Sequence, residues 1–164
     1  MPARIGACRP CRRMGRVGVA GGVPPVGGDT MFATQYRGDE ALSDGFKKTL
    51  DGLVGVSSSA KADVTRSRED RVKAAGEELK VLTADHPIVR THPETGRKAL
   101  YTSDAHTAHI KGWTEKESRP LLKLLWKHQT KPEFTCRFRW DVGQLSVWDT
   151  PCAMHMPISD YHGS

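Results

Sequence analysis

FTCRFRWDVGQLSVWDTPCAMH, residues 134–155, contains the clearest strand pattern in the sequence. Its first part alternates apolar residues with polar or basic ones, a period of two that is typical of a half-buried strand. The apolar positions are Phe134, Cys136, Phe138 and Trp140. Residues 141–144 (Asp-Val-Gly-Gln) have the composition of a turn, and a second strand begins at residue 145. These features predict a β-hairpin.

The predicted second strand leads to a single histidine. It contains Trp148 and Asp149, and His155 follows six residues after Asp149. A hairpin that ends near one histidine is a common way for a β-rich fold to present a metal ligand. We therefore single out His155 as a candidate ligand.

Length and charge limit the possible function classes. A chain of 164 residues has room for one domain with a hydrophobic core. Residues 1–28 contain five arginines and no acidic residue, so most of the net charge of +6 lies there and the remainder is nearly neutral. This argues against nucleic acid as a partner. No segment resembles a membrane span or a signal peptide, so we expect a cytoplasmic protein with no membrane partner.

The basic start of the chain is predicted to be a disordered arm. Residues 1–23 are rich in Gly, Pro and Arg and lack apolar periodicity, and we place the folded domain at residues 24–164. Cys8 and Cys11 have the spacing of half a zinc site, but no second pair of ligands follows at similar spacing. An incidental pair is therefore favoured, and a zinc- or anion-binding module on the arm is kept as an alternative.

Helices are predicted from their caps and their periodicity. Ser43 can cap a helix that carries apolar residues at four-residue intervals, namely Leu42, Phe46, Leu50 and Val54. Thr114 and Glu117 have the spacing of a capping box. The helix that they start is expected to run to about His128 and to bury four leucines, Leu121, Leu122, Leu124 and Leu125. The charged segment 66–80 is predicted to be a solvated helix.

Short strands separate these helices. Residues 30–32 are predicted to form a strand that leads into helical sequence, and residues 57–63 are expected to be a loop. Two strands within residues 87–102 flank the turn sequence at 93–96 and predict a second hairpin. Strands with intervening helices in this order predict an α+β fold.

Several short motifs, in order and at plausible spacing, resemble the TauD/TfdA family of Fe(II)- and 2-oxoglutarate-dependent dioxygenases. The resemblance extends from about residue 24 to residue 163. The motifs are Gly27-Gly28-Asp29-Thr30, Glu40-Ala41-Leu42-Ser43, His86–Pro93 with Gly96, Lys131–Phe134, Arg137–Trp140, Trp148-Asp149, His155 and Asp160-Tyr161. The resemblance implies an incomplete double-stranded β-helix (jelly-roll) with flanking helices.

The same resemblance implies a function. Family members couple the oxidative decarboxylation of 2-oxoglutarate to hydroxylation of a small organic substrate, such as a sulfonate or a sulfate ester. In the family, an early His-x-Asp pair and one later histidine hold Fe(II). His155 matches the later histidine, Thr30 matches a threonine that hydrogen-bonds a carboxylate of 2-oxoglutarate, and Tyr101 stands where an aromatic residue lines the substrate pocket.

Two features of the family have no counterpart in this sequence. The family places the His-x-Asp pair upstream of Thr30, and residues 1–23 contain no histidine. The arginine that pairs with the other carboxylate of 2-oxoglutarate would follow His155 at a position beyond the last residue. We therefore expect little or no activity from this chain alone.

Other candidate residues are interpreted as structural. His92-Pro93-Glu94 has the form of a His-x-carboxylate pair but lies in the turn between two strands. His106 and His109 are expected to have a surface role, and Cys152 to be a small buried residue rather than a redox or metal group. An alternative function is a non-catalytic remnant that serves as an interaction or dimerisation module, because an opened barrel exposes strand edges and apolar surface. A homo-oligomer is therefore an expected partner.

Overall fold

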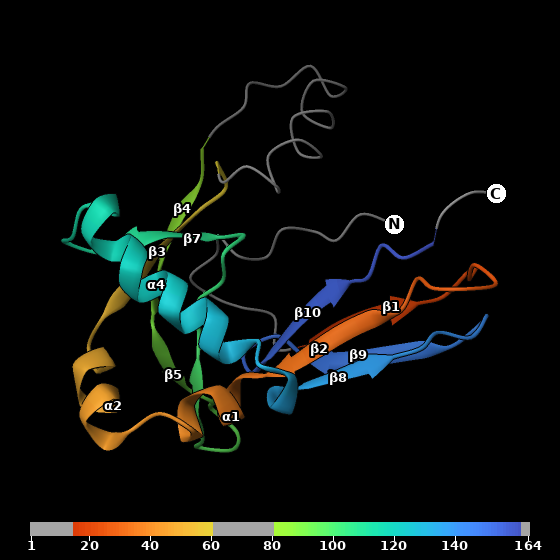
Figure 1. Cartoon of the computed structure of the whole chain (residues 1–164), viewed down its shortest axis with the longest axis horizontal. Coiled ribbons are helices and arrows are strands. Elements are labelled where there is room, and N and C mark those ends of the chain that lie inside the picture. Colours follow the sequence, from red (N-terminus) through yellow and green to blue (C-terminus); the bar gives the residue numbers. More distant parts are fainter. Residues whose placement is uncertain (1–14, 61–80, 162–164) are drawn as a thin grey trace. The chain divides into compact units, whose positions relative to one another are not determined.

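The computed structural model describes residues 15–60 and 81–161, which form two compact units (Figure 1). The first unit contains residues 43–60, 81–89 and 101–127, and the second contains residues 15–42, 90–100 and 128–161. Both units combine helices and strands, in agreement with the expected α+β class. The predicted helix at 66–80 and the cysteines Cys8 and Cys11 lie outside the described residues.

The described part of the first unit is built on a three-stranded antiparallel sheet in the order β4–β3–β7. The strands are β3 (Val54–Ser58), β4 (Thr83–Pro87) and β7 (Thr107–Ile110). Helix α2 (Asp44–Leu50) and most of α4 (Glu115–Gln129) belong to the same unit. The side chains with the lowest exposure form its core, namely Leu50, Ile88, Ile110, Leu122 and Leu125.

Both predicted helix caps are confirmed. The Ser43 hydroxyl accepts a hydrogen bond from the Phe46 N–H at 3.4 Å. The Thr114 N–H donates to Glu117 Oε2 at 2.8 Å, and the Glu117 N–H donates to Thr114 Oγ1 at 3.3 Å, which completes the capping box. Helix α2 is shorter than predicted, because it ends at Leu50 before the turn at Gly52, whose φ is +78°.

The apolar face of α4 is narrower than predicted. Leu122 and Leu125 are buried, and Gln129 lies on the same face at the next i, i+4 position. Leu124 lies off this face and is 52% exposed, so the prediction was wrong for this leucine. Among the described residues, no helix has the length and apolar character needed to cross a membrane.

Part of the segment expected to be a loop at 57–63 is a strand. Ser57 and Ser58 are the last residues of β3, in which Gly55 and Ser57 are buried. The buried positions of this strand hold small residues, so its sequence lacks the apolar alternation that marks most half-buried strands.

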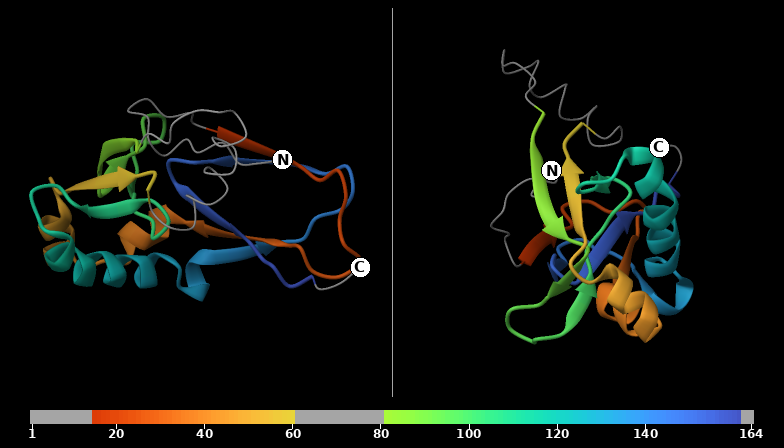
Figure 2. Two further views of the ribbon diagram at one scale, coloured as in Figure 1. Left: turned by 90° about the horizontal axis from the view of Figure 1, so that it is seen from above. Right: turned by 90° about the vertical axis from the view of Figure 1, so that its left-hand side faces the viewer.

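The second unit contains two antiparallel sheets. The larger has the order β10–β2–β8, made of β2 (Thr30–Thr34), β8 (Thr135–Phe138) and β10 (Ala153–Pro157). The smaller pairs β1 (Gly15–Val19) with β9 (Leu145–Asp149). Figure 2 shows these strands from two further directions. The predicted strand at 30–32 is confirmed as part of β2.

The second unit also holds the predicted hairpin at the turn 93–96. It consists of β5 (Val89–Thr91) and β6 (Lys98–Leu100), which pair with each other. Helix α1 (Gln35–Glu40) follows β2 directly and packs on β6 at Gly38, where an added Cβ would lie 3.3 Å from Leu100 Cδ1. A single 3₁₀ turn, η1 (Pro132–Phe134), precedes β8.

The prediction of a disordered arm over residues 1–23 is wrong for residues 15–19, which form β1. Val17 pairs with Val147 and Val19 with Leu145. Gly18 packs closely against two indole rings, because an added Cβ would be 3.1 Å from Trp148 and 3.2 Å from Trp140. Gly18 thus interrupts the apolar alternation of this strand at the position where Trp140 and Trp148 pack against it.

The prediction of a hairpin over residues 134–149 is also wrong. Its strands exist as β8 and β9, and its turn exists at Gly143, whose φ is +83°. However, β8 pairs with β2 and β9 pairs with β1. Alternation along the chain indicates a strand but does not identify its partner, and both partners here lie far earlier in the sequence.

Candidate functional site

His155 and Thr30 lie on neighbouring strands of the β10–β2–β8 sheet. The backbone register pairs His155 with Phe32 and Pro157 with Thr30. Because side chains alternate between the two faces of a strand, His155, Phe32 and Thr30 leave the same face. The structure therefore brings together two of the three site residues predicted from the sequence.

Aromatic rings surround His155. Its imidazole centroid lies 4.9 Å from the Trp148 ring and 6.3 Å from the Phe32 ring. Burial, together with the positive charge of Arg16, lowers the pKa of His155 below its ordinary value, which favours a neutral ring at pH 7. Neither ring nitrogen has a hydrogen-bond partner among the described residues, so a lone pair is available to a ligand.

Thr30 is a buried polar residue on the same face. Its hydroxyl accepts a hydrogen bond of 2.9 Å from Nε1 of Trp140, and the Trp140 ring packs edge-on against Phe138 with centroids 4.9 Å apart. Trp140 is a site residue that was not predicted from the sequence. No sequence signal indicates this contact, because it depends on the pairing of β2 with β8.

Arg137 forms hydrogen bonds with two aspartates close to Thr30. Arg137 of β8 donates from Nε to Asp29 at 2.5 Å and from Nη2 to Asp160 at 2.7 Å. The backbone N–H of Gly28 also donates to Asp160, and these contacts lower the pKa of that carboxyl. The network joins Asp29, directly before β2, and Asp160, shortly after β10, to β8 beside Thr30.

The described residues do not complete an Fe(II) centre. A facial triad needs two further side chains beside a histidine. Among the described residues, one group of three His, Cys, Asp or Glu side chains has ligand atoms within 4.8 Å of one another, and it comprises His92, Asp149 and Cys152. His155 does not belong to it, so no such group of three that includes His155 is present among the described residues.

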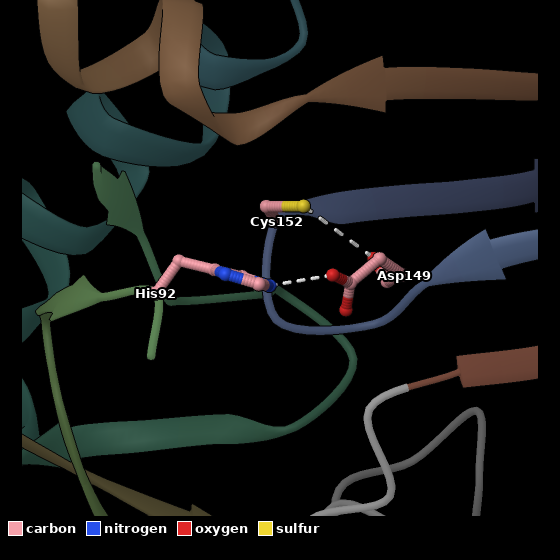
Figure 3. A group of neighbouring side chains, drawn as sticks. All are labelled: His92, Asp149 and Cys152. Carbon is pink, nitrogen blue, oxygen red and sulfur yellow. Dashed lines mark hydrogen bonds and ion pairs between the residues drawn. The ribbon is translucent and has the colours of Figure 1, made fainter. Parts of the chain in front are cut away.

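The group of His92, Asp149 and Cys152 is held by hydrogen bonds that do not suit a metal (Figure 3). His92 Nε2 lies 2.6 Å from Asp149 Oδ2, and His92 Nδ1 accepts the N–H groups of Glu94 and Thr95, both at 3.3 Å. Because Nδ1 accepts twice, the proton is assigned to Nε2, which donates to Asp149. A metal on Nε2 would move that proton to Nδ1, where it would face two N–H donors. The geometry therefore favours the structural interpretation of His92.

Cys152 lies at the edge of a cavity of about 380 Å³ within the second unit. Phe32, Tyr36 and Asp149 also line this cavity. Burial is the main cause of a raised pKa of the Cys152 thiol, so the thiol is a weak source of reactive thiolate. Cys152 is only half-buried, whereas the sequence predicted a buried residue.

The remaining candidate residues lie in the first unit. Tyr101 packs edge-on against His86, with ring centroids 5.5 Å apart, and its role in a substrate pocket stays a prediction. His106 lies 3.1 Å from the Ser103 hydroxyl through Nδ1, and His109 lies in β7. Both histidines are half-buried, and a surface role for them stays a prediction.

Comparison with known proteins identifies related enzymes. Residues 20–164 match the family described as taurine catabolism dioxygenase TauD, TfdA family. The chain is 34% identical to an alpha-ketoglutarate-dependent dioxygenase of Penicillium expansum over 84% of its own length and 38% of that protein. It is 31% identical to an alpha-ketoglutarate-dependent sulfate ester dioxygenase of Pseudomonas putida over 84% of its own length and 47% of that protein. The chain thus spans less than half the length of these two relatives.

A solved structure shares the fold of this chain. The crystal structure of AAD-2 in complex with Mn(II) and N-oxalylglycine superimposes with a TM-score of 0.77 at 30% sequence identity. The match covers 93% of this chain and 55% of that protein.

Proposed function

Because the chain belongs to the TauD/TfdA family, whose members use Fe(II) and 2-oxoglutarate, we propose that it supplies one half of such a dioxygenase site. This half carries the later metal-binding histidine, His155, and the threonine that contacts 2-oxoglutarate, Thr30. The observation that supports the proposal is that the two side chains leave the same face of adjacent strands, two register positions apart. We further propose that the two sheets of the second unit are part of a jelly-roll.

Each residue has a role that its surroundings favour. The neutral imidazole of His155 offers a nitrogen lone pair, and contacts with the Phe32 and Trp148 rings help to hold its orientation. The Thr30 hydroxyl donates to a carboxylate of 2-oxoglutarate. The proposed substrate is a small organic molecule such as a sulfonate or sulfate ester, with Tyr101 at its pocket.

Catalysis by the chain on its own is not part of this proposal. The described residues provide one side chain of the iron triad, and a single imidazole does not hold Fe(II). We therefore expect the chain to bind 2-oxoglutarate weakly but not to decarboxylate it.

The test has a binding arm and a turnover arm. A nuclear magnetic resonance (NMR) titration of the purified chain with 2-oxoglutarate is expected to perturb Thr30, and Thr30→Val is expected to weaken binding roughly tenfold or more, as for a hydrogen bond to a charged group. Succinate formation with Fe(II), 2-oxoglutarate, and taurine or an alkyl sulfate should not exceed that of His155→Ala. Thr30→Val binding with unchanged affinity would refute the Thr30 contact. Turnover that His155→Ala abolishes would refute the expectation of inactivity.

A second candidate function is that of an interaction module, which an exposed apolar face favours. Val17 pairs with Val147 and Val19 with Leu145, so these four side chains share one face of the β1–β9 sheet. Each is between 62% and 66% exposed. Apolar residues gathered in this way mark interaction surfaces.

Light scattering coupled to size-exclusion chromatography tests this second candidate. If the face associates, Val147→Lys should convert an oligomer to a monomer. Val142→Lys is the matched control, because Val142 is 71% exposed but lies in the turn before β9. A monomeric unmodified chain at high concentration would rule out self-association through this face.

A further inference from the structure

The Thr30 hydroxyl makes one of the three hydrogen bonds that it can form. A threonine hydroxyl can donate one hydrogen bond and accept two. The indole of Trp140 can only donate, so the 2.9 Å contact makes Thr30 Oγ1 the acceptor. The Thr30 residue is 9% exposed, and no acceptor for its hydroxyl hydrogen occurs among the described residues. The buried hydroxyl is therefore left with a hydrogen to donate.

The Trp140 ring packs against Phe138 and Gly18. Phe138 packs against it nearly at right angles, with an interplanar angle of 81° and centroids 4.9 Å apart. The Cα of Gly18 in β1 also approaches the ring so closely that an added Cβ would lie 3.2 Å from the indole. These contacts favour the ring orientation in which the indole N–H faces Thr30.

The hydrogen-bond direction has a consequence for ligand recognition. With one lone pair of the Thr30 oxygen engaged by Trp140, the hydroxyl rotor favours orientations in which its hydrogen points elsewhere, toward an incoming acceptor. A donor that is oriented before binding loses less entropy when it meets a carboxylate. Donation from another group also polarises the hydroxyl and strengthens its own donated bond.

We propose that Trp140 is a positioning residue that orients the Thr30 hydroxyl toward a carboxylate of 2-oxoglutarate. The inference rests on the proposed function of Thr30 and extends it to a residue that would not itself touch the ligand. It predicts that Trp140 contributes to carboxylate affinity only through Thr30.

A double-mutant cycle on the full chain tests this proposal. The affinity for 2-oxoglutarate is measured by NMR for the unmodified chain, Trp140→Phe, Thr30→Val and the double variant. Trp140→Phe keeps an aromatic ring and removes the N–H, so affinity should fall roughly two- to tenfold, as for one lost neutral hydrogen bond. In the Thr30→Val background the same change should have no further effect. Trp113→Phe, at a 41% exposed tryptophan of the first unit, is the control and should bind like the unmodified chain.

A second measurement covers the case in which Trp140→Phe does not fold. Thr30→Val should move the indole N–H resonance of Trp140 upfield and speed its hydrogen exchange, while the indole of Trp113 stays unchanged. An unmoved Trp140 resonance would overturn the proposal even without the tryptophan variant.

The possible results separate this inference from the proposed function. Equal affinity of Trp140→Phe and the unmodified chain overturns the inference and leaves the Thr30 contact intact. An equal loss in both backgrounds also overturns it, because Trp140 would then act independently of Thr30. If the unmodified chain shows no binding of 2-oxoglutarate, the proposed function itself fails, and the inference fails with it.

Discussion

His92 and His155 are the same residue type in the same compact unit, and they use their ring nitrogens in opposite ways. Both nitrogens of His92 are occupied, one by two backbone N–H donors and the other by the Asp149 carboxylate. Both nitrogens of His155 lack a partner among the described residues, and its neighbours are aromatic rings. A histidine that is fully hydrogen-bonded serves the fold, whereas one that keeps a lone pair can serve a ligand.

His92 and His155 are connected through the turn between β9 and β10. His92 holds Asp149, the last residue of β9, and the Gln35 N–H donates to the Cys152 carbonyl at 2.8 Å. These two bonds fix both ends of the turn that leads into β10, the strand that carries His155. One histidine thus supports the strand that presents the other.

Replacing His92, whose two ring nitrogens are both hydrogen-bonded, should lower the free energy of unfolding most. His92→Ala leaves the Asp149 carboxylate and two turn N–H groups without their partner and opens a cavity, so we expect the free energy of unfolding to fall by about 2–4 kcal/mol. His155→Ala, which loses ring contacts but no hydrogen bond, should cost about 1 kcal/mol. Urea denaturation measures both values. Equal losses for the two variants would break the distinction between the histidines.

A smaller effect is expected at the strand that packs beside His155. Gly18→Ala brings a Cβ within 3.1–3.3 Å of the Trp148 and Trp140 rings, and we expect it to destabilise the chain by about 1–2 kcal/mol. Gly21→Ala is the control, because an added Cβ there meets nothing within 4 Å, and its effect should stay within about 0.5 kcal/mol. Thermal unfolding with matched effects of the two variants would count against the packing of β1 on these rings.

His155 should make a smaller contribution, to the pH dependence of the free energy of unfolding. Its folded-state pKa is lowered by burial and by Arg16, so below its ordinary pKa the unfolded chain binds a proton that the folded chain does not. The contribution to stability is therefore complete above about pH 6.5 and is lost as the pH falls toward the folded-state pKa. Denaturation curves at several pH values, compared with His155→Asn, measure it. An identical pH slope in the variant would contradict the lowered pKa.

Local signals predicted local structure well. The Ser43 cap, the Thr114–Glu117 capping box and the hairpin at 93–96 each involve residues close in the sequence, and all three are confirmed. The partners of β8 and β9 depend on strands from much earlier in the chain, so alternation alone led to a false hairpin. Strand β1 was not predicted, because Gly18 interrupts its apolar alternation; the missing side chain there leaves room for two indole rings.

The candidate site was only partly accessible from the sequence. His155 and Thr30 were identified through the resemblance to a family, and the register of β2 with β10 places them on one face. The hydrogen bond from Trp140 to Thr30 and the tautomer of His92 could not be predicted, because both follow from contacts between distant segments. The sequence already favoured His155 as the ligand and a structural role for His92, and the hydrogen bonds of His92 supply the physical reason.

The most direct test of this distinction is a zinc titration of the full chain followed through the nitrogen resonances of its imidazole rings. Zn(II) is expected to shift the ring nitrogens of His155, and His155→Ala should abolish this response. His92 should keep the pattern of a neutral ring protonated at Nε2 throughout the titration. Zinc coordination at His92, with loss of its Nε2 proton while His155 stays unchanged, would refute the distinction between the two histidines.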